Sequence, residues 1–348
     1  MSATTTATEN TGSIYRKFWR SEDVENKTKE NLEKRKEKGS ELGNAYYDLA
    51  TDNYEDGWGR KFHFCRLQPG ESLDAGLARH EFFLALNLEL KPGMRVLDIG
   101  CGIGEPAREI AAFAGVHVTG ITINKFHVAR ARVLTKLSTL GDEHVKFEEA
   151  DFCNIPYPDN HFDAVYAIES TVHAPHLKDV YKEAHRVLKP GALFGTYEFL
   201  MTPKYDPSNT HHNAVKLRIE RGTGCHVITS EPDAKKALKE SGFELVRAQD
   251  MGIVTKEDSV AWWKPIDGDL SSFNTWKDWV KVFCLKKWVF AIAYWIFRLG
   301  ALLGLVNRET IIAMEEVSMG VFGMRDGGKL GIFTPMFFFV GRKPIKKD

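Results

Sequence analysis

The pattern of hydrophobic and polar positions along the chain changes at Pro92. Beyond it, short runs rich in β-branched residues alternate with stretches of helical periodicity, which is typical of βαβ units and a mostly parallel sheet. This alternation predicts an α/β fold with a sheet of seven strands. The predicted strands are 95–99, 116–121, 145–150, 162–168, 192–199, 243–249 and 333–341, and the predicted helices lie near 106–114, 125–139, 176–188 and 231–241.

Two parts of the chain do not follow this alternation and predict helical additions to the sheet. One is everything before residue 92, and the other is the stretch 252–330, which is rich in tryptophan and apolar residues. Long insertions near strand ends usually form lids or pocket walls. We expect disorder at 1–12 and a solvated helix at 22–38. The predicted organisation is a disordered and charged segment at 1–40, a substrate-side segment at 41–91, a core at 92–251 and a pocket-completing region at 252–348.

The stretch 289–306 is apolar on all sides except at one arginine, and by length it is a bare transmembrane candidate. A topological argument opposes a span, because the strand at 333–341 would then lie across the bilayer from the sheet that it completes. We expect instead a helix that walls a pocket or dips into one leaflet, with Lys286, Lys287 and Arg308 near lipid headgroups. An ordinary core helix is the alternative.

Composition and charge narrow the class of protein. The chain has 348 residues, of which 43% are hydrophobic and 27% charged, as in an ordinary folded protein. Lys plus Arg equals Asp plus Glu at 47 each, and no nucleic-acid-reading motif is present, so no nucleic-acid partner is expected. The five cysteines form no CxxC pair and no signal peptide is visible. These features favour a reducing, cytosol-facing location, and no metal is expected.

A glycine-rich turn follows the first predicted strand in the sequence VLDIGCGIG at 96–104. Glycines let the backbone take positive φ and approach a ligand closely. The helix start behind them offers N–H groups to a carboxylate, and Asp98 at the strand end offers a partner for an ammonium group. This pattern predicts a site for a ligand that carries both charges.

A dinucleotide site is the alternative for this turn, because residues 102–107 also fit the pattern G-x-G-x-x-A. That interpretation needs a carboxylate about 20 residues further on to hold the ribose diol. The second predicted strand ends in TGITIN at 119–124, with no acid. The dinucleotide interpretation also leaves Asp98 unexplained, so we do not prefer it.

The turn and its surroundings resemble the class I methyltransferases that use S-adenosylmethionine (AdoMet). The resemblance implies a Rossmann-like sheet with AdoMet as cofactor. It implies that the 98–104 turn holds the methionine end and that the end of the second strand faces the ribose in place of the usual acid. The adenine amino group would be reached from the segment after the third strand. The implied cofactor residues are Asp98, Gly100, Gly102, Gly104, Thr122, Asn124, Asp151 and Phe152.

The segment YEDGWGRKFHF at 54–64 is poor material for a core, with four aromatic residues, two carboxylates and a histidine. An electron-rich alkene attacks a sulfonium methyl only by developing a carbocation. Aromatic faces or a carboxylate can stabilise such a cation, and a base must then remove a proton. The segment supplies all three kinds of group. The alternative is an aromatic-rich loop that packs on the domain.

The chain from about Glu41 to Pro344 is similar to the sterol 24-C-methyltransferases. The motifs that carry the resemblance are the 54–64 segment, the glycine-rich turn, YAIESTVHAP at 166–175, Tyr197-Glu198 and GIFTPM at 331–336. The resemblance implies transfer of a methyl group from AdoMet to C24 of a Δ24 sterol side chain. A hydride shift from C24 to the C25 cation and loss of a proton would follow.

The resemblance also implies roles for individual residues. The aromatic residues implied to line the cation are Tyr54, Trp58, Phe62 and Phe64. The carboxylate implied to offset its charge is Glu55 or Asp56. Four residues stay open as the deprotonating base: His63, Glu169, His173 and Glu198. The other implied substrate contacts are Tyr166 and Tyr197.

Differences from the family pattern at Glu105, Val172 and Arg60-Lys61 leave room for a second substrate class, another isoprenoid alkene such as squalene. A non-catalytic sterol-binding protein is an alternative of a different kind. A water-insoluble sterol substrate implies a peripheral position at the cytosolic face of the endoplasmic reticulum or another internal membrane. Whether the chain forms a homo-oligomer stays open.

Overall fold

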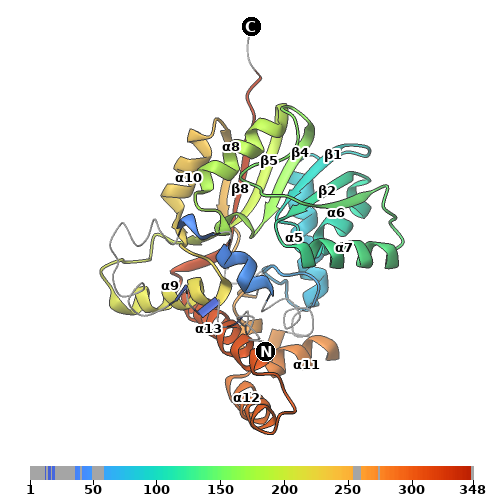
Figure 1. The fold of residues 1–348 in the computed structure, drawn as a ribbon. Helices are drawn as coiled ribbons and strands as arrows, with labels where there is room; N and C mark the ends of the chain where they lie inside the picture. The colour runs from blue at the N-terminus through green and yellow to red at the C-terminus, as the bar shows by residue number, and fades with distance from the viewer. Residues whose placement is uncertain are drawn as a thin grey trace, which may run out of the picture.

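A computed structural model describes residues 12, 15–16, 18–19, 36–39, 41–48, 59–253, 260–272 and 275–345. The segments expected to be disordered (1–12) and to form a solvated helix (22–38) lie almost entirely outside these residues, and so do residues 54–58. The described chain forms one sheet with helices packed on both of its faces (Figure 1).

The sheet has the strand order β3-β2-β1-β4-β5-β8-β7, with the short β6 paired to β5. The pairings are parallel except those of β8, which runs antiparallel to both β5 and β7. The order reverses between β1 and β4, so a ligand crevice is expected at their carboxyl ends. The strands are β1 (Arg95–Ile99), β2 (His117–Thr122), β3 (Val145–Glu149), β4 (Phe162–Ile168), β5 (Leu188–Met201), β6 (Thr229–Ser230), β7 (Glu244–Asp250) and β8 (Phe333–Arg342).

The predicted α/β fold is confirmed, and each of the seven predicted strands has a counterpart in the sheet. The eighth strand, β6, is only two residues long and had no sequence signal. The largest difference is in β5, which extends beyond the predicted 192–199 at both ends. Glu198 lies inside this strand, as described below.

Helices cover the sheet and form the additions on either side of it. The predicted helices correspond to α6, α7, α8 and α10, and residues 41–48 are also helical. The helices are α5 (Leu73–Asn87), α6 (Glu105–Ala114), α7 (Lys125–Leu137), η1 (Thr171–His173), α8 (Leu177–Val187), α9 (Thr210–Thr223), α10 (Glu231–Glu240), η2 (Pro265–Asp267), η3 (Leu270–Ser272), α11 (Trp276–Cys284), α12 (Lys287–Leu302) and α13 (Arg308–Leu330).

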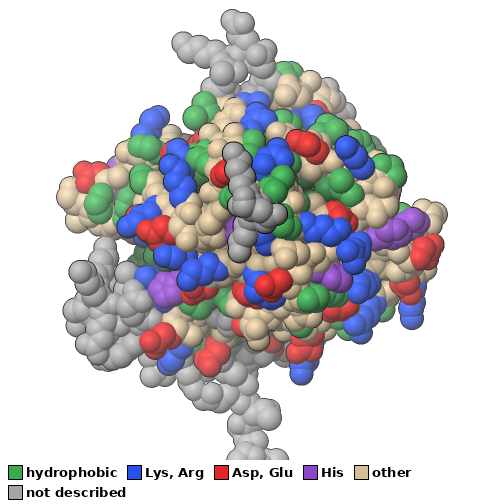
Figure 2. All heavy atoms as spheres, turned by 90° about the horizontal axis from the view of Figure 1, so that it is seen from above, with side chains coloured by type: hydrophobic (Ala, Val, Ile, Leu, Met, Phe, Trp, Pro, Cys, Tyr) green, Lys and Arg blue, Asp and Glu red, His purple; other side chains and the backbone are tan. Residues whose placement is uncertain are grey.

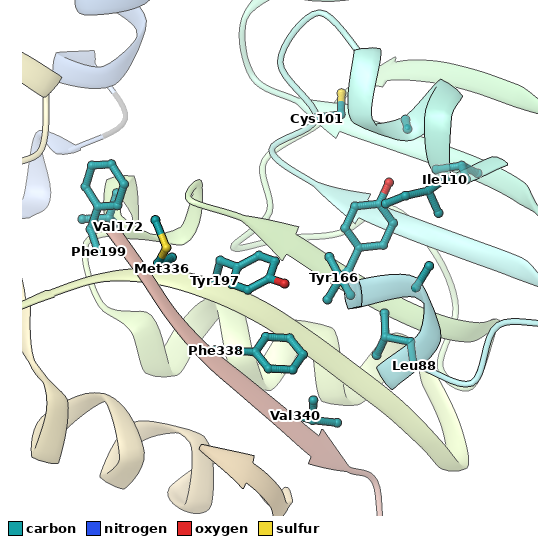
Figure 3. Packing of buried hydrophobic residues seen from close by; sticks show 14 of the residues in the cluster. Leu88, Cys101, Ile110, Tyr166, Val172, Tyr197, Phe199, Met336, Phe338 and Val340 are labelled. Carbon is teal, nitrogen blue, oxygen red and sulfur yellow. The ribbon is translucent and has the colours of Figure 1, made fainter. Parts of the chain in front are cut away.

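The two faces of the sheet form two cores because side chains alternate along each strand. Val96 of β1 packs in the core that contains α5, α6 and α7, whereas Leu97 and Ile99 pack in the core that contains α8 and α10. On the first side, the rings of Tyr197 in β5 and Phe338 in β8 lie together with centroids 4.9 Å apart (Figure 3). Both faces of the sheet are therefore apolar, so core packing does not account for the polar side chains at the carboxyl ends of its strands.

Helices α9 and α13 cross at very short distance because glycines meet at the contact. A Cβ atom added to Gly222 of α9 would lie 1.9 Å from the backbone nitrogen of Gly320 in α13. A Cβ atom added to Gly320 would lie 2.3 Å from the carbonyl oxygen of Gly222. The close crossing places α13 beside the carboxyl edge of the sheet, where it contributes to the site.

The N-terminal residues pack against this helix pair. Tyr15, Trp19 and Tyr46 form a small separate core with Ala313 of α13. Buried Glu316 of α13 accepts hydrogen bonds from Arg16 (2.8 Å) and from Arg221 of α9 (2.7 Å). This ion-pair network connects three parts of the chain that are far apart in sequence.

Helices α11 and α12 lie at the end of the molecule farthest from the sheet (Figure 1). No residue of α12 is buried, so the alternative of an ordinary core helix at 289–306 is wrong. None of the helices in the described ranges combines the length and hydropathy that a membrane crossing needs. The opposite end of the molecule carries basic and acidic side chains intermixed (Figure 2).

Candidate functional site

A pocket opens at the carboxyl ends of β1, β2 and β4, where the strand order reverses. We call it the edge pocket; it encloses about 980 Å³, part of which is open to solvent. Its walls come from five places: the turn after β1, the end of β2, residues 151–152 after β3, the segment 168–173 after β4, and N-terminal residues between 39 and 63. Segments predicted separately from the sequence therefore meet at one site.

The glycine-rich turn leads from β1 into α6 with three glycines at positive φ: 75° at Gly100, 53° at Gly102 and 79° at Gly104. Gly102 faces open space, where an added Cβ would meet no atom within 4 Å, and it lines the edge pocket. A Cβ on Gly104 would lie 2.2 Å from the Phe147 ring. Gly104 does not line the pocket; it caps α6 and lets the helix pack closely on β3.

Asp98 ends β1 with its carboxyl at the pocket wall and only 3% of the residue exposed. Burial raises the pKa of this carboxyl to about 7, an effect that the nearby Tyr166 hydroxyl opposes and Glu81 reinforces. The Tyr166 hydroxyl nevertheless makes no hydrogen bond of standard geometry within the protein. A cationic group that binds beside this buried carboxyl would lower its pKa again and so favour the ionised form.

The residues after β2 and β3 line the pocket beside the turn. Thr122 ends β2, Asn124 precedes α7, and Asp151 follows β3. The side-chain oxygen of Asn124 caps α7 by accepting from the His127 backbone N–H (2.9 Å), and its amide nitrogen donates to Asp48 (2.8 Å). Asn124 is thus held by the fold on both sides, and Asp48 brings a carboxylate to this end of the pocket.

The helical residues 41–48, which belong to the segment expected on the substrate side, form a wall whose individual residues the sequence did not indicate. Gly43, Asn44 and Tyr47 line the edge pocket. The ring of Tyr47 contacts the rings of His127 and His173 edge-on, with centroids 5.1 Å and 5.3 Å away. A short helical segment, far from the sheet in sequence, therefore closes the site.

A second pocket, which we call the apolar pocket, continues from the first; its volume is about 640 Å³, part of which is open to solvent. Its far wall consists mainly of apolar side chains from β5, η2 and α13, among them Phe199, Ile266, Val321 and Met324. From the 252–330 stretch, η2 and α13 supply lining residues, whereas no residue of α12 lines either pocket. Five residues line both pockets: Tyr47, Phe62, His63, Glu169 and His173.

Glu169 lies at this junction in a strained backbone conformation. Its φ of 54° is in the left-handed region, which costs energy for a residue with a side chain and is common at functional sites. Its carboxyl accepts a hydrogen bond from the Phe64 backbone N–H (2.8 Å). Burial raises the pKa of this carboxyl well above its usual range, and the hydrogen bond from Phe64 only partly offsets this.

His63 lies at the junction with both ring nitrogens engaged. Nε2 is 2.8 Å from Oε1 of the fully buried Glu81 in α5, and Nδ1 is 3.2 Å from the Phe64 carbonyl oxygen. Lys61 Nζ is 3.4 Å from the other Glu81 oxygen. Both ring nitrogens of His63 are therefore held by protein partners, and its role as a base stays a prediction.

His173 has a different arrangement. Burial lowers the pKa of its imidazole to about 4, so the ring is neutral at physiological pH. Its Nδ1 is 3.3 Å from the Gly224 carbonyl oxygen, to which only an N–H can donate. Nε2 then accepts from the Tyr47 hydroxyl at 3.0 Å. Tyr47 and His173 form a neutral hydrogen-bonded pair at the junction.

Glu198 is not at the junction. Because β5 runs to Met201, Glu198 lies inside the strand and does not follow it. Its buried carboxylate accepts hydrogen bonds from the hydroxyls of Thr171, Tyr181 and Thr196, and it lines neither pocket. Glu198 therefore lies outside both of these pockets, and its role as the base stays a prediction.

Two predicted substrate contacts also lie beneath the site. Tyr166 and Tyr197 are fully buried in the core and line neither pocket. The Tyr197 hydroxyl donates to the His80 carbonyl (3.1 Å), and its ring stacks on His80. The predicted residues that fall outside the described chain are Tyr54, Glu55, Asp56 and Trp58.

Relatives with curated names cover almost all of the chain. It is 41% identical over 332 residues to a sterol 24-C-methyltransferase of Gibberella zeae, covering 95% of this chain and 87% of the relative. It is 42% identical over 317 residues to the cycloartenol-C-24-methyltransferase of Arabidopsis thaliana, covering 90% of each. The chain belongs to the sterol 24-C-methyltransferase family.

Family models and solved structures agree with this membership. Residues 97–195 match a methyltransferase domain, and residues 280–345 match the sterol methyltransferase C-terminal family. The fold resembles that of the mycolic acid cyclopropane synthase CmaA1 (TM-score 0.65, 17% identity, 87% of this chain and 98% of that one). It also resembles a geranyl diphosphate methyltransferase (TM-score 0.61, 15% identity, 89% and 99%). The family member described here is an AdoMet-dependent methyltransferase.

Proposed function

We propose that this enzyme transfers a methyl group from AdoMet to C24 of a Δ24 sterol side chain. The observation that carries the proposal is the shared wall between the edge pocket and the apolar pocket. A ligand seated against Asp98 faces a chamber lined by Phe199, Ile266, Val321 and Met324, which suits a hydrocarbon substrate. The names of the relatives support a sterol as that hydrocarbon.

The residues of the edge pocket fit the cofactor. The space in front of Gly102 is where an added Cβ would project, and it lies at the start of α6, whose free N–H groups suit a carboxylate. The buried Asp98 suits the ammonium of the same amino-acid group, and Asp151 and Phe152 bound the far end of the pocket. When bound, AdoMet supplies an electrophilic methyl group on a sulfonium sulfur.

The walls at the junction suit the charge that the alkene develops when it takes up this methyl group. Phe62 and Phe64 present aromatic faces, and Glu169 presents a carboxyl that both pockets share. A cation in the apolar pocket favours the ionised form of Glu169, whose pKa is otherwise raised by burial. Ionised Glu169 then stabilises the cation in a medium where water screens little. The hydrogen bond from the Phe64 backbone N–H holds the carboxyl at this place.

Tyr47 and His173 are placed to remove the proton. The substrate C–H bond breaks, its proton passes to the Tyr47 oxygen, and its electron pair becomes the new carbon–carbon double bond. At the same time the Tyr47 proton passes along the 3.0 Å hydrogen bond to Nε2 of His173. His173 ends as an imidazolium, with its Nδ1–H held by the Gly224 carbonyl. A weak base is sufficient, because a proton beside a carbocation is very acidic.

The test of the function is incubation with labelled AdoMet and separate substrates: Δ24 sterols, Δ24(28) sterols and squalene. We expect mass spectrometry to show a C24-methylated product from a Δ24 sterol. Methylated squalene with unchanged sterols would contradict the substrate and support another isoprenoid alkene. Sterol binding without any methylated product would support a non-catalytic sterol-binding protein.

We also propose that the enzyme works at the cytosolic face of an internal membrane. Sterols are nearly insoluble in water, so the substrate resides in a bilayer. All five cysteines lie among the described residues as free thiols, which accords with a reducing compartment. Fractionation of cells that express a fluorescently tagged chain would test this location.

A further inference from the structure

The exposed apolar side chains of the described chain are concentrated on α11 and α12. These two helices and the short connection between them, residues 276–303, form what we call the α11–α12 hairpin. Four of the eight tryptophans in the sequence lie on it, namely Trp276, Trp279, Trp288 and Trp295, and each is at least 49% exposed. Tryptophan side chains of this kind are typical of the interface between lipid and water.

Helix α12 has two different faces. Phe290 and Tyr294 point to α13: the Phe290 ring is 5.8 Å from that of Phe322, and the Tyr294 hydroxyl donates to Glu315 (2.5 Å). The opposite face carries Trp288, Ile292, Trp295, Leu299 and Leu302, at spacings of three and four residues, and each is more than half exposed. One stripe of the helix is thus fixed to the protein, and the other has no protein covering it among the described residues.

The exposed charges on the hairpin itself have one sign. Residues 275–308 contain four lysines, two arginines and one aspartate. The aspartate, Asp278, is buried and accepts hydrogen bonds from Thr275 and the Leu73 backbone N–H, so it does not face outward. Lys277, Lys286 and Lys287 flank the exposed tryptophans. A basic rim around an apolar face is complementary to anionic lipid headgroups.

The length of α12 fits a helix that lies in the plane of the interface. Its 16 residues span about 24 Å at 1.5 Å per residue, less than the roughly 30 Å hydrocarbon core of a bilayer. The chain then returns through α13 to β8, which lies inside the sheet between β5 and β7.

From these observations we infer that the α11–α12 hairpin docks on an anionic lipid bilayer, with the exposed face of α12 among the acyl chains at the interface. The docked hairpin presents the substrate chamber to the lipid, because α13 contacts α12 on one side and contributes Val321 and Met324 to the apolar pocket on the other. This step rests on the proposed function, since it assumes that the chamber takes a membrane lipid.

The experiment is flotation of the full chain with vesicles of phosphatidylcholine, with and without phosphatidylserine. The test variant is Leu299→Glu/Leu302→Glu, at positions 58% and 78% exposed on α12. The matched control is Leu86→Glu/Leu137→Glu, at positions 66% and 77% exposed on α5 and α7. We expect the wild type and the control to float with the vesicles that contain phosphatidylserine. The affinity of the test variant for these vesicles should be lower by about tenfold or more.

A second measurement does not depend on a variant. In vesicles with brominated acyl chains, wild-type tryptophan fluorescence should be quenched by up to half, because four of the eight tryptophans are on the hairpin. Unquenched fluorescence, or equal flotation of the wild type and the test variant, would overturn the inference. So would a wild type that does not float but self-associates in sedimentation while the test variant stays monomeric.

Methyl transfer to a sterol delivered by cyclodextrin separates this inference from the proposed function. The test variant should keep the wild-type rate on that substrate, because α12 lines neither pocket. If the wild type floats and its tryptophan fluorescence is quenched but it methylates no sterol, the proposed function is contradicted and the inferred docking surface is not.

Discussion

Two buried carboxyls, Asp98 and Glu169, lie at different places in the site. Asp98 faces the edge pocket alone, whereas Glu169 faces both pockets. Burial raises the pKa of each carboxyl, and a cation beside either one favours its ionised form. One carboxyl thus suits the charge of the bound cofactor, and the other suits the charge that the substrate develops.

The Asp98 pKa predicts how cofactor binding depends on pH. With a pKa of about 7, the carboxyl is protonated below neutral pH in the free protein, and a ligand ammonium must displace that proton. The affinity for AdoMet should therefore rise as pH rises toward 7 and level off above it, by up to about tenfold per pH unit. Isothermal titration in two buffers of different ionisation enthalpy should detect a released proton below pH 7.

Asp98→Asn is the control, because it should bind AdoMet weakly and without this pH dependence. Since the folded pKa lies above the unfolded one, the cost of ionising Asp98 is absent below about pH 4 and complete above about pH 7. Without ligand, Asp98→Asn should therefore have a higher free energy of unfolding than the wild type at pH 8. This difference between variant and wild type should be smaller at pH 5. A stability difference that does not change with pH would contradict the raised pKa.

The Tyr47–His173 pair predicts a change of product. Tyr47→Phe keeps the ring but removes the hydroxyl that receives the substrate proton, so turnover should fall by about 10²–10⁴. A cation that is not deprotonated can be captured by water, and we expect a tertiary alcohol beside the alkene in the mass spectrum. Tyr46→Phe is the matched control, because the Tyr46 hydroxyl donates to the Gly222 carbonyl and not to His173. Unchanged rate and product in Tyr47→Phe would point to Glu169 as the base.

Sequence reasoning found the residues whose position follows from a strand end and missed those placed by tertiary packing. Asp98, Thr122 and Asp151 line the edge pocket as expected, because the carboxyl ends of parallel strands meet at one edge. Tyr47 had no local signal, since its place depends on how residues 41–48 dock. Glu198 was expected to follow β5, but it lies within the strand, which continues for three more residues to Met201.

At the level of elements, the α9–α13 crossing decides where the far wall of the apolar pocket lies. α13 supplies Val321 and Met324, and Cys225, just after α9, lines the same pocket. The glycine contact between Gly222 and Gly320 leaves no room for a side chain. Any increase in volume there must move one helix and with it the pocket wall.

Gly222→Ala should therefore destabilise the enzyme by about 2 kcal/mol or more, because the added methyl meets backbone atoms that cannot rotate away. Chemical denaturation of the protein without ligand measures this. Gly43→Ala is the control, since its added Cβ meets nothing closer than 3.7 Å. Equal stability of Gly222→Ala and the wild type would mean that the two helices separate at low cost.

The strands and helices of the core were predictable because their hydrophobic period is regular, whereas the helical additions were not. In α9, THHNAVKLRIERGT, the apolar residues are few, and its packing on α13 depends on glycines that a period cannot detect. In α12, apolar residues surround the helix, so the sequence could not tell a core helix from an exposed one. Only the contact of one face with α13 separates these cases.

For the whole molecule, the network around Glu316 joins the N-terminal residues to the pocket wall. Arg16 binds both Glu315 and Glu316, and Arg221 binds Glu316. The Glu316 side chain is fully buried, whereas that of Glu315 is 36% exposed. The segment that carries Tyr47 is anchored on the same small core.

Glu316→Gln should lower the free energy of unfolding by about 3 kcal/mol, because it leaves two arginines without a buried countercharge. Glu315→Gln, which changes the next residue in the same way, should cost about 1 kcal/mol or less, since solvent screens that pair. Thermal unfolding of both variants gives the comparison. Similar losses in the two variants would contradict the importance of burial in this network.

The position of β8 has a consequence for biosynthesis. β7 pairs with β8 and not with β5, so the β5 edge stays open on a ribosome-bound nascent chain until residues 333–342 have emerged. More than 130 residues are translated between β5 and β8, and during that interval a long apolar strand exposes its backbone groups. Chaperones that protect strand edges should therefore engage this protein late in translation.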